Sequence, residues 1–129
     1  MTVCDPCPRG KISTIKGAAT SLSCQNCSAG TYSDLTGLVA CKECIAGTWD
    51  NTVGKIISEC KDCAVGRYNM EEGASSGSSC KACPMGRYSG RIASSDVKSC
   101  RPCVAGYFSN IIGASSSTFC KACIAGTYN

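Results

Sequence analysis

Fourteen cysteines are the residues of this 129-residue chain whose type and spacing could do chemistry. They fall into seven C-x-x-C pairs, which begin at residues 4, 24, 41, 60, 80, 100 and 120. Successive pairs therefore start 17 to 20 residues apart. Cysteines paired in this way can bind zinc, act as a redox motif or form disulfides, so the surrounding sequence has to discriminate among the three.

Zinc binding and redox chemistry fit this sequence less well than disulfide bonding. Seven pairs leave one over if two pairs make a four-cysteine zinc site, and a redox motif needs one activated pair on a βαβ frame. Cysteine makes up about 11% of the chain, above the roughly 8–10% that marks a disulfide scaffold. We therefore predict disulfides, no metal and no cofactor, in a protein that is extracellular or at the cell surface.

The sequence between the pairs repeats as closely as the cysteines do. A first glycine lies three residues after each second cysteine: Gly10, Gly30, Gly47, Gly66, Gly86, Gly106 and Gly126. A ring follows two residues later, except at Ile12: Tyr32, Trp49, Tyr68, Tyr88, Phe108 and Tyr128. A second glycine lies ten residues after the second cysteine, with Ala93 as the exception: Gly17, Gly37, Gly54, Gly73 and Gly113. A serine-rich run then leads into the next pair.

These positions predict the elements that hold the cysteines. The glycines suit turns, the residues around each ring are β-prone, and no segment has the apolar period of a helix. We expect a small disulfide-rich fold of short β-strands and turns without substantial helix, arranged as an elongated, solenoid-like array of about 20-residue repeats. The predicted repeats are 1–23, 24–40, 41–59, 60–79, 80–99, 100–119 and a partial seventh, 120–129.

Periodicity reduces the number of disulfide patterns worth considering. Bonds that close each glycine–ring loop form a simple ladder: Cys7–Cys24, Cys27–Cys41, Cys44–Cys60, Cys63–Cys80, Cys83–Cys100 and Cys103–Cys120. Each such loop adds roughly 3 kcal/mol of stability in the loop-entropy description. In the alternative pattern, every cysteine bonds to a pair further along and the modules interlock. The ladder leaves Cys4 and Cys123 to pair outward, with flanking repeats or a neighbouring chain.

The segments CKACPMGRYSG, SCRPCVAGYFSN and FCKACIAGTYN resemble the ephrin-receptor-like (GCC2/GCC3) cysteine-rich repeats. They are more distantly similar to the modules of tumour necrosis factor receptors and to C-x-x-C repeat surface proteins of protists. In such repeats the cysteine before x-x-G-x-aromatic pairs with one about 15 residues further on, so the resemblance implies the ladder. Ile12, Ala93 and the shortened second loop depart from the pattern.

Charge and hydropathy exclude several functions. The formal charge of +4 is scattered without a basic run, so we expect no nucleic-acid partner. No apolar stretch approaches the ~20 residues of a membrane span, so we expect no membrane insertion of this segment. The chain has no histidine, paired carboxylates or phosphate loop, so we predict that it is not an enzyme.

Two functions remain. Near-identical repeats favour an extracellular structural protein, a disulfide-laddered rod or filament segment such as a surface fibre, stalk or flagellar-hair-like appendage, within a longer array or polymer. The alternative is the ligand-binding ectodomain of a receptor, which predicts one or two repeats with unusual exposed residues. Candidates for these are Trp49, Arg67, Arg87, Arg91 and Ile111–Ile112, although ring stacking on neighbouring repeats for Trp49 and solvated faces for the arginines are the simpler explanations.

The predicted partners are neighbouring copies of the chain or flanking repeats, together with glycans. Asn26 heads an N-x-S sequence and is a candidate for N-glycosylation. Its middle residue is Cys27, whose bonding would restrict access to the site. The serine-rich runs are candidates for O-linked sugars.

Overall fold

A computed structural model describes residues 4–129 and divides the chain into two compact units. Among the described residues, the first comprises 4–45, Trp49–Lys61 and Glu72–Gly77, and the second Ala46–Thr48, Asp62–Glu71 and Ser78–Asn129. Because each unit gathers segments of several predicted repeats, the unit boundaries do not test the repeat boundaries, which stay a prediction.

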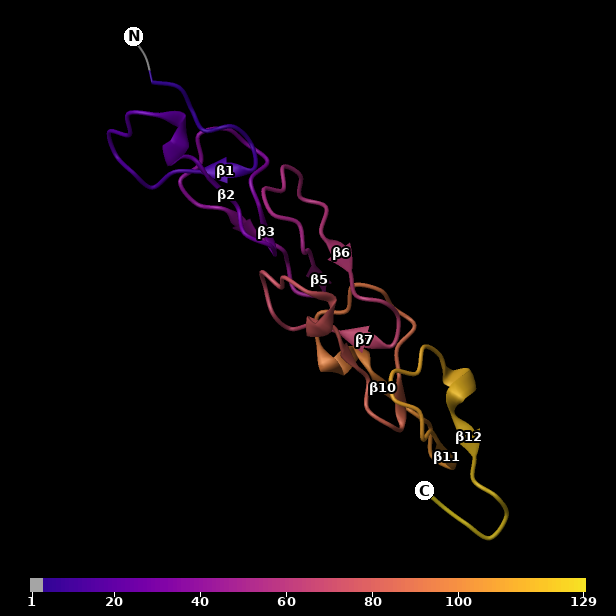
Figure 1. Cartoon of the computed structure of the whole chain (residues 1–129). Helices are drawn as coiled ribbons and strands as arrows, with labels where there is room; N and C mark the ends of the chain where they lie inside the picture. The colour runs from indigo at the N-terminus through magenta and orange to yellow at the C-terminus, as the bar shows by residue number, and fades with distance from the viewer. Residues whose placement is uncertain (1–3) are drawn as a thin grey trace. The chain divides into compact units, whose positions relative to one another are not determined.

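The strands are two residues long and pair two by two (Figure 1). In the described part of the chain they are β1 (Lys11–Ile12), β2 (Gln25–Asn26), β3 (Thr31–Tyr32), β4 (Lys42–Glu43), β5 (Thr48–Trp49), β6 (Lys61–Asp62), β7 (Arg67–Tyr68), β8 (Lys81–Ala82), β9 (Arg87–Tyr88), β10 (Arg101–Pro102), β11 (Tyr107–Phe108) and β12 (Lys121–Ala122). The six sheets are β1–β2, β3–β4, β5–β6, β7–β8, β9–β10 and β11–β12.

Each pair follows one rule. The strand after a first glycine pairs with the two residues inside the next C-x-x-C; in β7–β8, Arg67 lies opposite Ala82 and Tyr68 opposite Lys81, antiparallel. The strand at the ring was predicted and is confirmed. The partner strand inside the cysteine pair was not predicted, because two residues are too few to show a β alternation.

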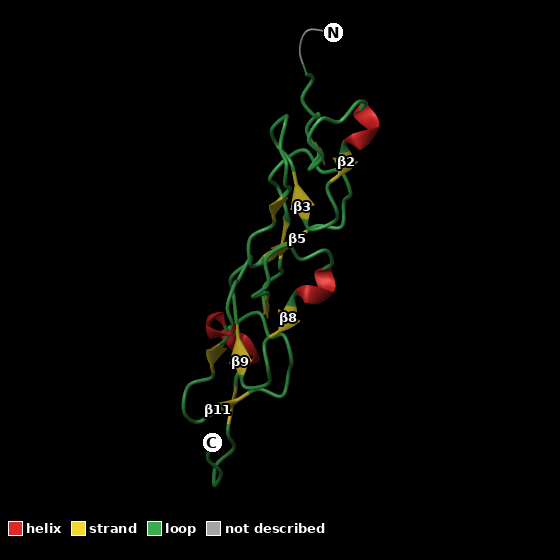
Figure 2. Ribbon diagram, turned by 90° about the vertical axis from the view of Figure 1, so that its left-hand side faces the viewer, coloured by secondary structure: helices red, strands yellow, loops and turns green. Residues whose placement is uncertain are grey.

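Short 3-10 turns form where the serine-rich runs end (Figure 2). Within residues 4–129 these are η1 (Ser21–Ser23), η2 (Gly77–Ser79), η3 (Val97–Ser99) and η4 (Ser117–Phe119). Each turn directly precedes a cysteine. After η1, η3 and η4 the N–H of this cysteine donates to the first carbonyl of the turn, as Cys100 N–H does to Val97 O at 2.9 Å. The prediction of short strands and turns without substantial helix is confirmed for the described residues.

The interior is built from sulfur and small polar groups. Cys27 and Cys83 are 0% exposed, whereas Leu22 is 88% exposed. Only two non-cysteine apolar residues, Ala74 and Ala114, are fully buried among the described residues. With so little apolar burial the hydrophobic effect contributes little, so cross-links and backbone hydrogen bonds must supply the stability.

Candidate functional site

The six disulfides of the described residues join the pairs of the simple ladder: Cys7–Cys24, Cys27–Cys41, Cys44–Cys60, Cys63–Cys80, Cys83–Cys100 and Cys103–Cys120. The bonded residues are 14 to 17 positions apart, and their Cα atoms lie 5.6 to 6.0 Å apart. The two cysteines of one motif bond in opposite directions along the chain. Cys24 bonds back to Cys7 and Cys27 bonds forward to Cys41.

Two cysteines lie outside the ladder. Cys4 is exposed and Cys123 is partly exposed, and neither has a disulfide partner within residues 4–129. Both are the cysteines for which outward pairing was predicted, and that pairing stays a prediction.

Backbone hydrogen bonds join each repeat to the next in the same way. The N–H of every second cysteine from Cys27 onward donates to the first-glycine carbonyl of the preceding repeat, at 2.8 or 2.9 Å. In return, the N–H at the second-glycine position donates to the second-cysteine carbonyl of the preceding repeat. Examples are Gly73 to Cys44 at 2.8 Å and Ala93 to Cys63 at 2.9 Å. The junction is therefore independent of most side chains.

A further contact skips one repeat. The Cα of Gly30 faces the backbone of Gly73, two repeats later, so closely that an added Cβ would lie 2.8 Å from the Gly73 carbonyl carbon and closer to its oxygen. Gly10 meets Gly54, Gly47 meets Ala93, and Gly66 meets Gly113 in the same arrangement. We call this the glycine contact. It explains physically why the first glycine recurs, since a side chain there would displace backbone.

A buried polar residue directly follows five of the six rings, and this position was not singled out from the sequence. Ser33, Asp50, Asn69, Ser89 and Ser109 are at most 8% exposed. Four of them accept a hydrogen bond from the N–H two residues on, such as Thr52 N to Asp50 Oδ1 at 2.7 Å and Glu71 N to Asn69 Oδ1 at 2.9 Å. Restriction of this position to Ser, Asp and Asn, the residues that form such turns, was the signal in the sequence.

Asp50 is the charged member of this set. Its Oδ2 lies 2.8 Å from Nζ of Lys55, and the side-chain exposures are 0% for Asp50 and 14% for Lys55. Burial acts to raise the pKa of Asp50, but the Lys55 ammonium and the Thr52 hydrogen bonds outweigh it and hold the pKa below the ordinary aspartate value. A buried carboxylate therefore stays ionised because its partner lies beside it.

Four of the predicted ring side chains are half-buried, namely Tyr32, Trp49, Tyr68 and Tyr88. Phe108 is 39% exposed and Tyr128 is 96% exposed. Nζ of Lys61 lies 4.8 Å from the centre of the Trp49 ring, a cation–π distance. Stacking of the rings on neighbouring repeats stays a prediction.

Other candidates from the sequence have identifiable positions. Nη1 of Arg67 donates to Cys80 O at 3.1 Å, and Nη1 of Arg87 donates to Cys100 O at 3.0 Å. Each of these arginines therefore hydrogen-bonds to the backbone of the cysteine that closes its own loop. Ile112 is 64% exposed and Ile111 is partly exposed. Asn26 is an exposed residue of β2, and its following Cys27 is bonded and buried, so its glycosylation stays a prediction.

The described residues contain no helix long and apolar enough to cross a membrane.

Small units closed by disulfides and hydrogen-bonded through their backbones define a class, the cysteine-rich repeat modules. The family described as tyrosine-protein kinase ephrin type A/B receptor-like matches residues 30–80 and 51–100, more than half of the chain. The chain therefore belongs to the ephrin-receptor-like family of cysteine-rich modules, which are extracellular and typically non-catalytic. No curated protein matches the chain.

Proposed function

We propose that this chain is a structural segment of an extracellular rod or filament, in which the disulfide ladder resists stretching and proteolysis. The observation that supports the proposal most is the repetition of one junction. The second-cysteine to first-glycine hydrogen bond recurs six times in the described residues, at 2.8 to 2.9 Å. A repeat that binds its neighbours through backbone groups can be added without limit, as in other solenoids.

The ladder also suits a load-bearing role. Tension along the chain passes through each disulfide and bypasses the 14 to 17 residues of the loop that it closes. Apart from the disulfides, only the three-residue steps between paired cysteines, such as Cys24 to Cys27, and the two terminal segments then lie in the path of the force. Unfolding a loop cannot lengthen the segment past its disulfide, which is a useful property in a stalk or fibre.

Solution scattering tests the rod directly. If the repeats add along one axis with two or three strands each, at a spacing of ~4.8 Å, the chain spans on the order of 65–100 Å and has a radius of gyration of about 20–30 Å. A compact domain of this size would have about 14 Å. A value near the compact one for the oxidised monomer would rule out the rod.

The proposed partner is another repeat of the same type, from flanking repeats or a neighbouring copy. Four first glycines make the glycine contact, but Gly86, Gly106 and Gly126 have nothing within 4 Å of the Cβ position. These three positions have the same backbone conformation as the filled ones, with φ of +81° to +87° against +77° to +89°. They fit the second-glycine turn of a further repeat.

Sedimentation of the oxidised chain, with Cys4 and Cys123 replaced by serine, tests this partner without disulfide exchange. We expect concentration-dependent association that Gly106→Ala weakens, while Met70→Ala, at an exposed side chain of the fourth repeat, acts as the control away from both ends of the chain. A chain that stays monomeric up to millimolar concentration contradicts association with copies of itself. The rod would survive that result, because scattering tests it separately.

A further inference from the structure

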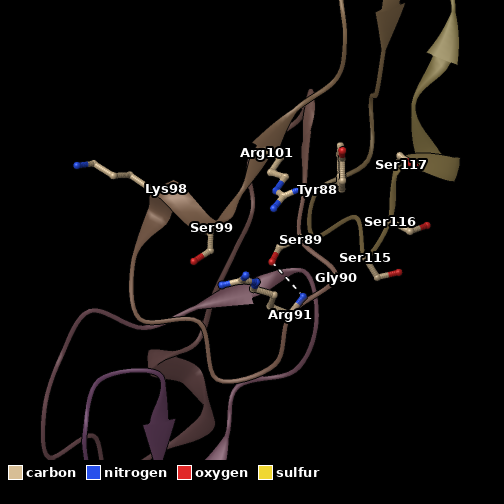
Figure 3. Close-up of a pocket in the computed structure, with 10 residues that line it drawn as sticks. All are labelled: Tyr88, Ser89, Gly90, Arg91, Lys98, Ser99, Arg101, Ser115, Ser116 and Ser117. Carbon is tan, nitrogen blue, oxygen red and sulfur yellow. Dashed lines mark hydrogen bonds between the residues drawn. The ribbon is translucent and has the colours of Figure 1, made fainter.

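The fifth repeat carries a hollow of about 570 Å³ within the second unit (Figure 3). Its lining includes three cations, Arg91, Lys98 and Arg101, and no carboxylate. The ion pairs found among residues 4–129 are Lys42–Asp34 and Lys55–Asp50, so these three cations lack an acidic partner within the described residues. In Figure 3 the side chains of Arg91 and Arg101 lie near Ser89 and Tyr88, while Lys98 points away at the rim.

Hydroxyl groups make up much of the remaining wall. Ser115, Ser116 and Ser117 come from the sixth repeat and line the hollow together with the half-buried ring of Tyr88. In Figure 3 the hydroxyl oxygens of Ser115 and Ser116 are directed to the side away from the two arginines. Ser116 Oγ also lies 2.6 Å from Thr118 Oγ1. A hydroxyl can both donate and accept hydrogen bonds, whereas an arginine presents a planar fork that fits a carboxylate or sulfate.

The fourth repeat provides an internal comparison, because its equivalent residues lie 20 positions earlier. The residue equivalent to Arg91 is Glu71, the one equivalent to Lys98 is Ser78, and the one equivalent to Arg101 is Lys81. The residue equivalent to Ser116 is Asp96. Three cations without a carboxylate thus become one cation with two carboxylates. The same framework is therefore compatible with either charge, and the cationic lining of the fifth repeat is not required by the fold.

Gly90 is the second difference between the two repeats. Its counterpart is Met70, whose side chain is 63% exposed. Gly90 lacks a side chain at the hollow, and a Cβ placed there would meet Ser115 O only at 3.5 Å. It is not among the glycines with positive φ, so its backbone does not require glycine. The hollow is open at Gly90 because this residue has no side chain.

We propose that this hollow binds an acidic polysaccharide, one that carries sulfate or carboxylate groups on its sugar rings. The two arginines would hold the anionic group, the serines would exchange hydrogen bonds with sugar hydroxyls, and the Tyr88 ring would offer an apolar face to the sugar ring. An acidic peptide would satisfy the arginines but has few hydroxyls to match the serines. Such a site would attach the segment to a charged extracellular matrix.

Titration calorimetry with a short dextran sulfate tests the site in the whole oxidised chain. The variant Arg91→Glu with Ser116→Asp introduces the residues of the fourth repeat, and Gly90→Met fills the hollow without changing charge. We expect each to weaken binding about tenfold or more, the first because it removes a charge-assisted hydrogen bond and the second because the methionine side chain would occupy space that the sugar needs. Lys16→Glu, an exposed reversal in the first unit, should weaken binding less than about threefold, as expected for a screened distant charge.

Five comparisons, two with variants and three with other ligands, decide between this site and its alternatives. Equal losses in Lys16→Glu and in the Arg91→Glu, Ser116→Asp variant would show attraction by net charge and overturn the site. Full affinity of Gly90→Met would overturn it as well. Polyglutamate binding as tightly as dextran sulfate would replace the polysaccharide with an acidic peptide, and inorganic sulfate binding as tightly would reduce the site to a bare anion site. Neutral dextran should not bind, and unchanged circular dichroism of the oxidised variants should establish that each is folded.

Discussion

The backbone of Gly30 packs directly against the backbone of Gly73, although 43 residues separate them in the sequence. Gly30 also adopts φ of +84°, a conformation that disfavours any side chain. The close approach to Gly73 and the positive φ therefore both disfavour a side chain at Gly30, and their costs can be measured separately.

Gly30→Ala should lower the free energy of unfolding by about 3 kcal/mol, from strain at positive φ and a clash with Gly73. Gly86→Ala has nearly the same φ, +81°, but nothing within 4 Å, so it should lose only about 1–2 kcal/mol. Denaturant unfolding of the oxidised variants measures both. Equal losses would mean that the glycine contact does not constrain the fold.

Ala93 occupies a second-glycine position at φ of +55°. Replacing it by glycine should relieve the left-handed strain and raise the free energy of unfolding by about 0.5–1 kcal/mol, after the greater freedom of glycine in the unfolded chain is subtracted. Ala105→Gly, at an exposed turn position without positive φ, should instead be neutral or slightly destabilising. Destabilisation by Ala93→Gly in thermal melts would contradict the assigned strain.

The Asp50–Lys55 ion pair should make stability fall in acid. Because the pKa of Asp50 is lower in the folded protein than in the unfolded chain, its contribution is complete above the unfolded value near 3.9 and is lost as the pH falls through the lower folded value. Asp50→Asn keeps an acceptor for Thr52, as Asn69 does for Glu71, but removes this dependence. Melting temperatures between pH 6 and pH 2 measure the difference.

The control for this titration is Asp34, which forms an exposed ion pair with Lys42 at 2.9 Å. Asp34→Asn should leave the acid dependence almost unchanged, because exposed pairs contribute little. If Asp50→Asn and the unaltered chain lose stability in parallel below pH 4, the buried pair is not the source of the acid sensitivity.

Disulfides rather than metal should hold the fold together. Reduction should abolish near-ultraviolet circular dichroism, whereas a chelator without reductant should leave it intact. Removing the Cys63–Cys80 bond alone, by alanine at both positions, should cost about 3 kcal/mol, as expected for a closed loop with a separation of 17 residues. Loss of structure in chelator alone would favour metal binding instead.

Local structure was largely predictable from the repeats, and long-range contacts were not. The strand at Tyr68 and the turns at the glycines follow from residue type and spacing. The approach of Gly30 to Gly73 could not be predicted, because a periodic sequence shows which positions recur but not which copies meet. The Asp50–Lys55 pair occurs in one repeat, and the partner strand Lys81–Ala82 is too short to carry a pattern.

The central claim, a disulfide ladder that limits extension, is tested most directly by pulling single molecules from their termini. With the six disulfides intact, the chain should reach only roughly 140 Å at full extension, and after reduction roughly 450 Å, at about 3.5 Å per extended residue. Repeated pulling of the oxidised chain should give the short value each time. An oxidised chain that extends to the reduced length would contradict the ladder and the load-bearing function proposed from it.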